Sequence, residues 1–501
     1  MATVSDKLKL IFGLKIKQLR LEKGLSLSDL ARKINFSISY LNEIEKGKKY
    51  PKADKIFQLS YALDVDYDSL VSLKMNKHLE PIAELLDSDI LTQLPLEIFG
   101  IEPTDFLDLM SSAPTKLSAF ISTVSEISRH LDFNIQKFYL AVMRSYQEMY
   151  DNYFPDIEAD AMRFLAEFQA EIQYAEPYIS GKFLEKILIE KYGYSIENYD
   201  QNTYPSLMSL RSVYIPEQNK LLINQGLSPE QRAFTMGREL GYQFMNIKNR
   251  PLMSSAFEAS SFELVFNNFK ASYFAGALLI NRQLLINDLE VLFAQSSWQD
   301  QFFQKIMAKF NTTPERFLLR MTHVLPSHFG IQQLFFLRFN QIEGIDFFAI
   351  EKEMHLARQH SPHGTALREH YCRRWSAVSI LKELEQTQNK AEKENKILVK
   401  TQISSYLDTN NKYFLISVAK PSPPVSGRNS SVNLGLVIDE SLRKKLKFLD
   451  NDTIIQKEVN HTCERCRLDN CQDRAAKPRI WEDNQHQKDL KNTLLSLGIK
   501  V

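Results

Sequence analysis

The residues best suited to hold a metal or a metal cluster are the four cysteines, three of which lie close together near the C-terminus. Cys463, Cys466 and Cys471 have the spacing C-x2-C-x4-C, and Cys372 lies far upstream in the segment HYCRRW. Three thiolates on one short loop can converge on one centre, and a distant fourth completes a set of four sulfur ligands. This set suits either zinc or an iron–sulfur cluster, and unrelated structural cysteines are the alternative.

The neighbourhood of these thiols is basic. The flanking arginines are Arg373, Arg374, Arg465, Arg467 and Arg474. Their charge should offset that of a thiolate-bound centre and lower the pKa of the thiols. His370 and His461 each lie two residues from a cysteine and could replace a thiol ligand, although an ordinary loop histidine is the simpler interpretation.

A second pattern related to metal chemistry lies in the segment QRAFTMGRELGYQFMN, which we predict to belong to a helix beginning near Ser228. A zinc peptidase helix carries two histidines four residues apart and a glutamate beside the first that activates water. Arg238, Glu239 and Tyr242 stand at these positions here. Neither arginine nor tyrosine gives a comparable zinc site, and a general base without its metal has little to activate. We therefore expect no peptidase activity and no enzyme function.

A cleft that has lost its metal can still bind a ligand. Arg211, Arg232 and Arg238 lie in or beside this segment and could contact anionic groups, although a solvated surface charge is the simpler interpretation of each. The 16 glycines form neither a GxGxxG motif nor a P-loop, so a nucleotide-like ligand would be held in some other way.

Composition excludes several other classes of protein. The 501 residues suffice for roughly three or four domains, and 44% hydrophobic with 25% charged residues is ordinary for a globular protein with a large core. The net charge of +1 gives no global attraction to nucleic acid. The longest apolar stretch, residues 271–280, is too short for a membrane span, and the first residues do not resemble a signal peptide. We expect a cytoplasmic protein without membrane contact.

Residues 1–72 have the pattern of a small helical DNA-binding unit. Five helices are expected, over residues 8–23, 27–34, 37–46, 52–63 and 66–72. Ser26 and Ser37 can cap the second and third helices, Asn35 tolerates the left-handed conformation of a tight turn, and Gly47 can end the third helix. Two short helices joined by a tight turn make a helix-turn-helix.

Residues 37–51, SISYLNEIEKGKKYP, resemble the recognition-helix region of the XRE/phage-repressor family. The resemblance implies a dimer that binds paired half-sites in double-stranded DNA. By this resemblance the groove residues are Ser37, Ser39, Tyr40 and Asn42, and the phosphate contacts come from Ser28, Lys48 and Lys49. The alternative is a small helical bundle that binds another protein.

Residues 80–175 are predicted to be almost wholly helical. A broad apolar and aromatic face there comprises Tyr139, Val142, Met143, Tyr146, Met149, Tyr150 and Tyr153. Such a face either packs within its own domain or forms the interface of a homodimer, where aromatic and methionine side chains are enriched.

The frame RELGY resembles the HELGH-type motif of the ImmA/IrrE peptidase family, and residues 266–282 resemble its second helix. Asn268 falls near the expected third metal ligand, a glutamate in that family. The parts of this chain resemble, in the same order, those of the short-chain fatty acyl transcriptional regulators. These parts are the repressor head, the helical linker, the degenerate ImmA/IrrE segment, CRRW and the terminal cysteine motif. That family includes the propionate (methylcitrate-cycle) and glyoxylate-cycle regulators.

That resemblance implies a regulator of fatty-acyl and carbon metabolism genes that responds to short-chain acyl-CoA. It also implies a [4Fe–4S] cluster, bound by Cys372, Cys463, Cys466 and Cys471. The alternatives are a regulator in which the four thiolates hold structural zinc, and an ImmA-like metallopeptidase that cleaves a repressor.

The predicted fold is multidomain, mainly α with α+β parts. The expected domains are a helix-turn-helix head (1–72), a helical linker or dimerisation region (73–175), a degenerate zincin-like ImmA/IrrE domain (176–325) and a C-terminal α/β sensor domain with the cysteine site (326–501). The expected strands of the ImmA/IrrE domain are YGYSIENY, LRSVYIPEQ and NKLLINQ. Those of the sensor domain are LFFLRFN, FFAIEKE, ILVKTQISSY, YFLISVAK and VNLGLVID, with QTQNKAEKENK and KPSPPVSGRNSS as breaks.

Overall fold

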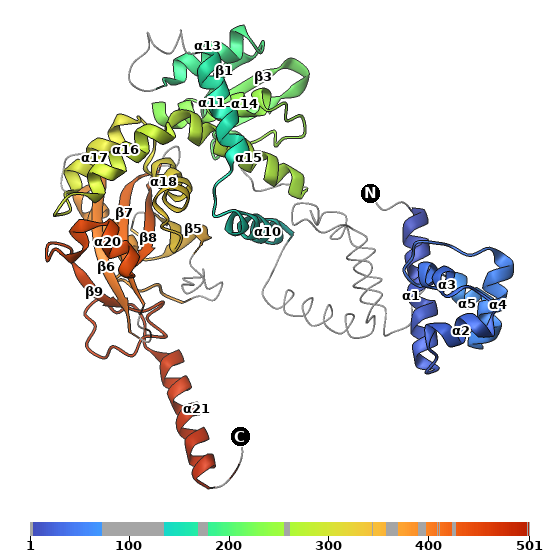
Figure 1. The fold of residues 1–501 in the computed structure, drawn as a ribbon. Helices are drawn as coiled ribbons and strands as arrows, with labels where there is room; N and C mark the ends of the chain where they lie inside the picture. The colour runs from blue at the N-terminus through green and yellow to red at the C-terminus, as the bar shows by residue number, and fades with distance from the viewer. Residues whose placement is uncertain are drawn as a thin grey trace. The chain divides into compact units, whose positions relative to one another are not determined.

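The structure is a computed structural model. It describes residues 4–72, 135–168, 179–254, 261–342, 344–356, 369–388, 397–407, 409, 411–422, 427–497 and 499. Backbone contacts divide the chain into two compact units, one with the N-terminal helices and one with most of the remaining chain (Figure 1). The part of the expected helical linker at residues 73–134 lies outside the described residues. Within the described ranges, no helix is both long and apolar enough to span a bilayer.

The N-terminal unit has the five helices that the sequence predicts. They are α1 (Val4–Glu22), α2 (Leu27–Lys33), α3 (Ile38–Glu45), α4 (Ala53–Leu63) and α5 (Tyr67–Val71). The Ser26 and Ser37 side chains accept hydrogen bonds from the first turns of α2 and α3. Asn35 (φ 53°) and Gly47 (φ 68°) adopt the expected left-handed conformation. Helices α2 and α3 therefore form a helix-turn-helix, as predicted.

A buried ion pair and a close helix approach join α1 to α3. Arg20 Nε lies 2.6 Å from Glu45 Oε1, and Arg20 Nη2 lies 2.8 Å from Glu45 Oε2. Gly13 lets the helices meet, since a Cβ atom there would lie 2.2 Å from the Ile44 carbonyl oxygen. These contacts fix the recognition helix against the rest of the unit.

The predicted apolar face on α10 (Ile135–Met149) packs largely within its own chain. Val142 and Met143 are buried. The Tyr146 ring stacks on Phe154 with centroids 5.3 Å apart and meets the edge of Phe266 at 5.1 Å. Only the C-terminal end of the face is open, with Met149 49% and Tyr150 45% exposed. The second unit continues with α11 (Pro155–Glu167) and α13 (Gly181–Glu190).

A three-stranded sheet and five helices form the middle of the second unit. The strands are β1 (Ser195–Tyr199), β2 (Ser212–Ile215) and β3 (Lys220–Asn224), in the order β1-β3-β2, with β1 parallel and β2 antiparallel to β3. The helices are α14 (Pro229–Phe244), α15 (Phe262–Leu279), α16 (Arg282–Phe293), α17 (Asp300–Lys309) and α18 (Pro314–Phe329). Ser228 and Gln231 form a capping box at the start of α14, which confirms the predicted helix start.

A six-stranded sheet forms the C-terminal part. Its strands are β4 (Leu334–Ile342), β5 (Phe348–His355), β6 (Leu398–Tyr406), β7 (Lys412–Pro421), β8 (Arg428–Val437) and β9 (Gln456–Val459), in the order β5-β4-β8-β7-β6-β9. Helix α19 (Ser376–Gln388) packs on this sheet, and α20 (Glu440–Lys445) and α21 (Arg479–Ser496) follow. None of the described α21 side chains is buried.

Two details of the sequence prediction need correction here. Only β6 and β9 pair in parallel, so the sheet is mainly antiparallel and the region is α+β rather than α/β. The polar segments expected as breaks are partly regular: β8 begins at Arg428 and α19 continues to Gln388. Backbone pairing with β4 and β7 orders the start of β8 despite its polar sequence.

Candidate functional site

The residues expected in the DNA groove lie on or beside α3. Ser39 and Asn42 are exposed, and Tyr40 is half-buried with its ring 5.4 Å from that of Phe36. Ser37 has a structural task as well, since its Oγ accepts a hydrogen bond from the Tyr40 backbone N–H at 3.1 Å. Asn42 and Ser39 are therefore the side chains of this set with the most freedom to reach a base edge.

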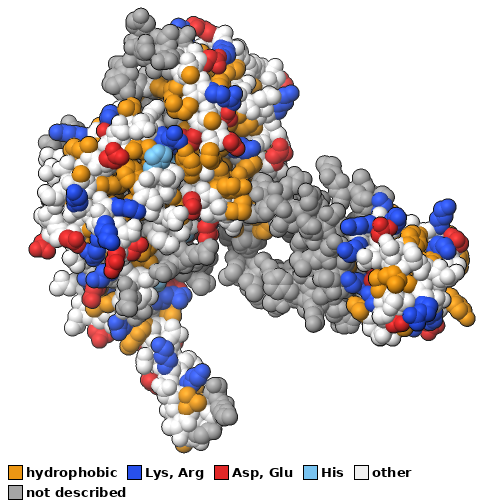
Figure 2. Space-filling view, in the orientation of Figure 1, with side chains coloured by type: hydrophobic (Ala, Val, Ile, Leu, Met, Phe, Trp, Pro, Cys, Tyr) orange, Lys and Arg blue, Asp and Glu red, His pale blue; other side chains and the backbone are white. Residues whose placement is uncertain are grey.

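The residues expected at phosphates differ in whether another side chain already binds them. Lys48 is exposed, and Ser28 Oγ lies 2.8 Å from Ser26 Oγ. Lys49 forms an ion pair with Glu43 at 2.7 Å, and the hydrogen bond and charge of Glu43 raise the pKa of Lys49. Figure 2 shows basic and acidic side chains interspersed over the visible face of this unit. Glu43, which the sequence analysis did not single out, competes with phosphate for Lys49.

The zincin-like positions on α14 are occupied by a hydrogen-bonded, buried set of side chains. Arg238 Nη2 donates to Ser212 Oγ at 3.2 Å, and the Tyr242 hydroxyl donates to Asn268 Oδ1 at 3.1 Å. Tyr242 and Asn268, at two of the three expected ligand positions, thus bind each other. Burial, together with the charge of Glu239, raises the pKa of Tyr242 to about 12.

Arg250 is the residue of this site that the sequence analysis missed. Its guanidinium forms an ion pair with Glu239, which is 2% exposed, and it lies over the rings of Tyr214 and Tyr242, at 3.9 and 4.4 Å from their centroids. It also donates to the Tyr194 hydroxyl at 3.1 Å. A fixed cation therefore neutralises the carboxylate that would act as general base in a peptidase.

All four cysteines line one cavity of about 310 Å³. Cys372, Cys463 and Cys466 are buried, and Cys471 is half-buried. An antiparallel bridge joins Tyr371 to Thr462 and so brings the two cysteine segments together. In the described residues, no group of three or more His, Cys, Asp or Glu side chains is arranged closely enough for a single metal ion.

Two buried carboxylates hold the cysteine segments in place. Glu464 accepts hydrogen bonds from the His370 backbone N–H, at 3.0 Å, and lies 2.8 Å from His370 Nδ1. Glu369 binds Arg465 through both carboxylate oxygens, at 2.7 and 2.8 Å, and accepts from the Thr462 hydroxyl at 2.6 Å. His370 is thus engaged by a carboxylate rather than directed as a free ligand.

The expectation that neighbouring arginines lower the thiol pKa is wrong for Cys372, and for Cys466 the arginine effect is smaller than that of burial. Burial raises the pKa of Cys372 to about 11 and raises that of Cys466. The arginines have other partners: Arg373 binds Asp346, Arg465 binds Glu369, and Arg467 donates to the Leu407 carbonyl. Only Arg474 among these lowers the Cys466 pKa, and less than burial raises it.

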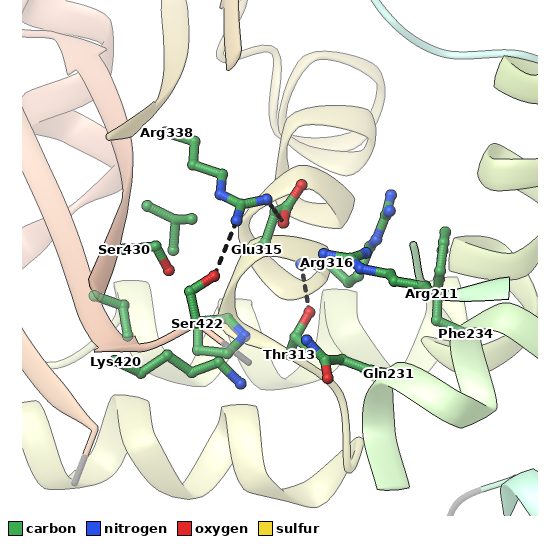
Figure 3. Close-up of a pocket in the computed structure, with 13 residues that line it drawn as sticks. Arg211, Gln231, Phe234, Thr313, Glu315, Arg316, Arg338, Lys420, Ser422 and Ser430 are labelled. Atoms are coloured by element: carbon green, nitrogen blue, oxygen red, sulfur yellow. Dashed lines mark hydrogen bonds and ion pairs between the residues drawn. The ribbon is translucent and has the colours of Figure 1, made fainter. Parts of the chain in front are cut away.

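The three arginines proposed as ligand contacts do not share one site. Arg211 lines a second cavity of about 480 Å³ between α14, the start of α18 and the six-stranded sheet (Figure 3). Arg232 instead pairs with Glu185 at 3.1 Å, and Arg238 is held by Ser212. The other cations of this cavity, Arg316, Arg338 and Lys420, were not identified from the sequence.

The helix-turn-helix with its exposed recognition helix defines a DNA-binding protein. Comparison with known proteins agrees: a helix-turn-helix family model matches residues 16–70, and an IrrE N-terminal-like domain model matches residues 199–322. An uncharacterised HTH-type transcriptional regulator of Sinorhizobium fredii is 34% identical over 67 residues, which are 13% of this chain and 86% of that protein. The chain therefore belongs to the XRE-type helix-turn-helix transcriptional regulators.

Two further relatives are also HTH-type transcriptional regulators. The SinR regulators of Bacillus licheniformis and Bacillus subtilis are each 40% identical to this chain over 65 residues. The aligned region covers 59% of the length of each SinR protein and 13% of this chain. A Mycobacterium tuberculosis transcriptional regulator of known structure superposes with a TM-score of 0.44 and 16% identity, over 66% of this chain and 92% of that one.

Proposed function

We propose that this transcriptional regulator is a homodimer whose second unit senses a metabolic or redox signal through a thiolate-bound cofactor. The observation that carries the proposal is that all four cysteines of the chain line one cavity although Cys372 is remote from the others in sequence. Four thiolates form a complete ligand set for a [4Fe–4S] cluster or for zinc.

The cluster is the cofactor we favour, because the family resemblance implies it and the donor set is all sulfur. The cluster would supply redox chemistry that the side chains lack, whereas zinc would make the site structural. Cys372, Cys463, Cys466 and Cys471 would hold the cluster, whereas a single zinc ion would need these side chains closer together than they lie here. Burial raises the pKa of Cys372 and of Cys466, so a bound cation would be needed to keep these two thiols ionised near neutral pH.

We further propose that the IrrE-like domain is not a peptidase. Arg238 and Tyr242 replace the two histidines, and Glu239 is already neutralised by Arg250. Loss of catalysis leaves the domain free to bind a ligand, and the resemblance suggests a short-chain acyl-CoA. Such a signal needs to favour one conformation of the regulator by only about 1–3 kcal/mol to alter DNA affinity severalfold or more.

The test of the cofactor is metal and sulfide analysis of full-length protein purified without oxygen. The proposal predicts roughly four iron and four sulfide per chain, with most of both lost in Cys466→Ser. Lys477→Gln, an exposed change in the same loop, serves as the control and should keep full iron content. One zinc and no iron would establish the structural alternative, and no metal at all would remove the cofactor from the proposal.

The test of sensing is DNA binding by the same preparation. Anaerobic and oxidised protein should differ at least severalfold in operator affinity, and Cys466→Ser should abolish the difference. Equal affinity in both states, with the cluster intact in one and lost in the other, would contradict a redox signal. Sedimentation analysis of the full chain checks the dimer independently.

A further inference from the structure

Helix α21 lacks the packing that usually stabilises a helix in a protein. Figure 1 shows it extending away from the six-stranded sheet, and none of its 18 residues is buried against the described chain. Most helical stability in proteins comes from packing one face against a neighbour, and an isolated helix of this length is marginal in water. The stability of α21 therefore depends on a contact that the described chain does not supply.

One face of α21 has the residue spacing of a seam between two helices. Steps of three and four residues connect five positions on this face: Ile480, Asp483, Gln487, Leu490 and Leu494. At roughly 100° per residue these positions form one narrow stripe, which is the pattern of the positions that pack against a second helix. Leu490 on this stripe is 48% exposed, so its apolar surface is available to a partner.

The stripe is complementary to a second copy of itself that runs in the opposite direction. In an antiparallel pair with its twofold axis at Gln487, residues equally far from Gln487 on opposite sides lie at the same level. Asp483 of one copy then faces Lys491 of the other, which lies beside Leu490 at the edge of the stripe. Ile480 faces Leu494 in the same way. Because the axis repeats each contact, the pair gains two apolar contacts and two ion pairs.

Other partners of α21 lack this complementarity. A parallel pair of the same helices would place Asp483 opposite Asp483 and Lys491 opposite Lys491, so like charges would face each other across the seam. Acidic and basic residues are mixed along the rest of the helix, so it offers no surface of one sign to DNA or to an anionic membrane. An antiparallel second copy is therefore the partner that the charges fit.

The first turn of α21 is bound to the loop that carries three of the cysteines. The backbone N–H groups of Ile480 and Trp481 donate to the Glu464 carbonyl oxygen at 3.0 and 3.1 Å. The Glu464 carboxylate in turn accepts from the His370 backbone N–H at 3.0 Å, two residues before Cys372 in the sequence. Both cysteine segments are thus connected to the start of α21, and a change at the cysteine site can alter the direction of the helix.

We propose that α21 pairs with α21 of a second copy of this chain, in an antiparallel arrangement with the twofold axis at Gln487. The inference rests on the proposed function in taking the regulator to be a homodimer, and it names the surface that joins the two copies. Since the pair lies next to both cysteine sites, the state of each site has a direct route to the geometry of the dimer. That geometry sets the spacing of two DNA-binding units on paired half-sites.

The experiment is sedimentation equilibrium of the full-length protein and its charge variants. Asp483→Lys and Lys491→Asp each bring like charges together in the pair, so each alone should raise the dimer dissociation constant at least about tenfold. The double variant exchanges the two charges and should return to within about threefold of wild type. Asp489→Lys makes the same change as Asp483→Lys on the opposite side of the helix and should dimerise as wild type does.

Mixing the two single variants gives a second test that does not depend on comparing separately folded proteins. One variant has lysine and the other aspartate at both positions, so the mixture should form heterodimers although neither variant dimerises well alone. Single variants that dimerise as tightly as wild type, or a double variant and a mixture that both stay monomeric, would overturn the pairing of α21. A wild-type dimer with that result leaves the homodimer itself intact, whereas a monomeric wild type contradicts both.

Discussion

The carboxylate of Glu239 on α14 forms a buried ion pair with the guanidinium of Arg250, which follows the helix in the sequence. Glu239 stands where a zincin-like helix would carry its general base. The pair is isolated from solvent, because the side chains of Glu239 and Arg250 are 2% and 6% exposed. Each charge therefore depends on the other for its stability in the interior. The carboxylate that a peptidase would use to activate water is thus bound in an ion pair within the protein.

Removing one partner of this ion pair should strongly lower the stability of the protein. Arg250→Gln should lower the free energy of unfolding by about 3–5 kcal/mol, because it leaves the Glu239 charge buried without a partner. The double variant Glu239→Gln, Arg250→Gln should recover part of that loss. Urea unfolding of the full chain measures both, with exposed Lys248→Gln as the control. A single variant as stable as wild type would show that the carboxylate is neutral or solvated.

DNA binding should depend on Lys48 and Asn42 in different ways. Lys48→Ala should weaken binding to all sequences and reduce the slope of log affinity against log salt by about one, as expected for one lost phosphate contact. Asn42→Ala should instead reduce discrimination between operator and unrelated DNA. Fluorescence anisotropy over a salt series separates the two effects. An unchanged slope for Lys48→Ala would remove this residue from the phosphate contacts.

The Glu43–Lys49 ion pair leads to a prediction of tighter binding. Glu43→Gln removes the partner of Lys49 and a negative charge near the recognition helix, so DNA affinity at low salt should rise severalfold. Asp68→Asn makes the same charge change at an exposed site on α5 and should have a smaller effect. Equal increases in both variants would mean that net charge alone, and not release of Lys49, sets the affinity.

Acid should destabilise the second unit through Glu158. Burial alone would raise the pKa of Glu158, but hydrogen bonds and charge from Arg320 and a hydrogen bond from Tyr273 lower it overall. A lowered folded-state pKa means that the ion pair contributes stability above the unfolded value of about 4.3, and that this contribution is lost as pH falls through the folded value.

The corresponding experiment compares wild type with Glu158→Gln. The variant should be less stable at pH 7 by about 3–5 kcal/mol, and the difference in free energy of unfolding should shrink as the pH falls below about 4.3. Urea unfolding of both proteins at several pH values measures this difference in the free energy of unfolding. A difference that stays constant down to the acid transition would contradict the role of the Glu158 charge.

Local features of the fold were predictable from the sequence, and long-range pairs were not. Serine caps and left-handed turn residues act within a few residues, so Ser26, Ser37 and Asn35 marked the helix-turn-helix correctly. The four cysteines stood out because their side chains have one shared chemistry. The Glu239–Arg250 pair and the meeting of Arg211, Arg338 and Lys420 depend on chain segments that the fold brings together. The sequence pattern gives no sign of such contacts, because charged residues usually lie on the surface of a protein.

Arg474 holds the cysteine loop by binding the backbone of that loop. Its guanidinium donates to the carbonyl oxygens of Cys463 and Cys466, at 3.1 and 3.2 Å, and to that of Leu468. Arg474 is thus a positioning residue for two thiols. Glutamine cannot span these acceptors. Under the proposed cluster assignment, Arg474→Gln should therefore lower iron and sulfide content together, and the proposed cluster should be lost faster in the presence of a chelator.

A purely structural role for Arg474 would instead lower thermal stability equally in protein with and without the cofactor. Lys477→Gln in the same loop should leave iron, sulfide and the rate of loss unchanged. Arg474→Lys should restore part of the cofactor content, because one ammonium group can still bind one or two of the carbonyl oxygens. Full iron and sulfide content and an unchanged rate of loss in Arg474→Gln would show that the thiols do not need this arginine to hold the proposed cluster.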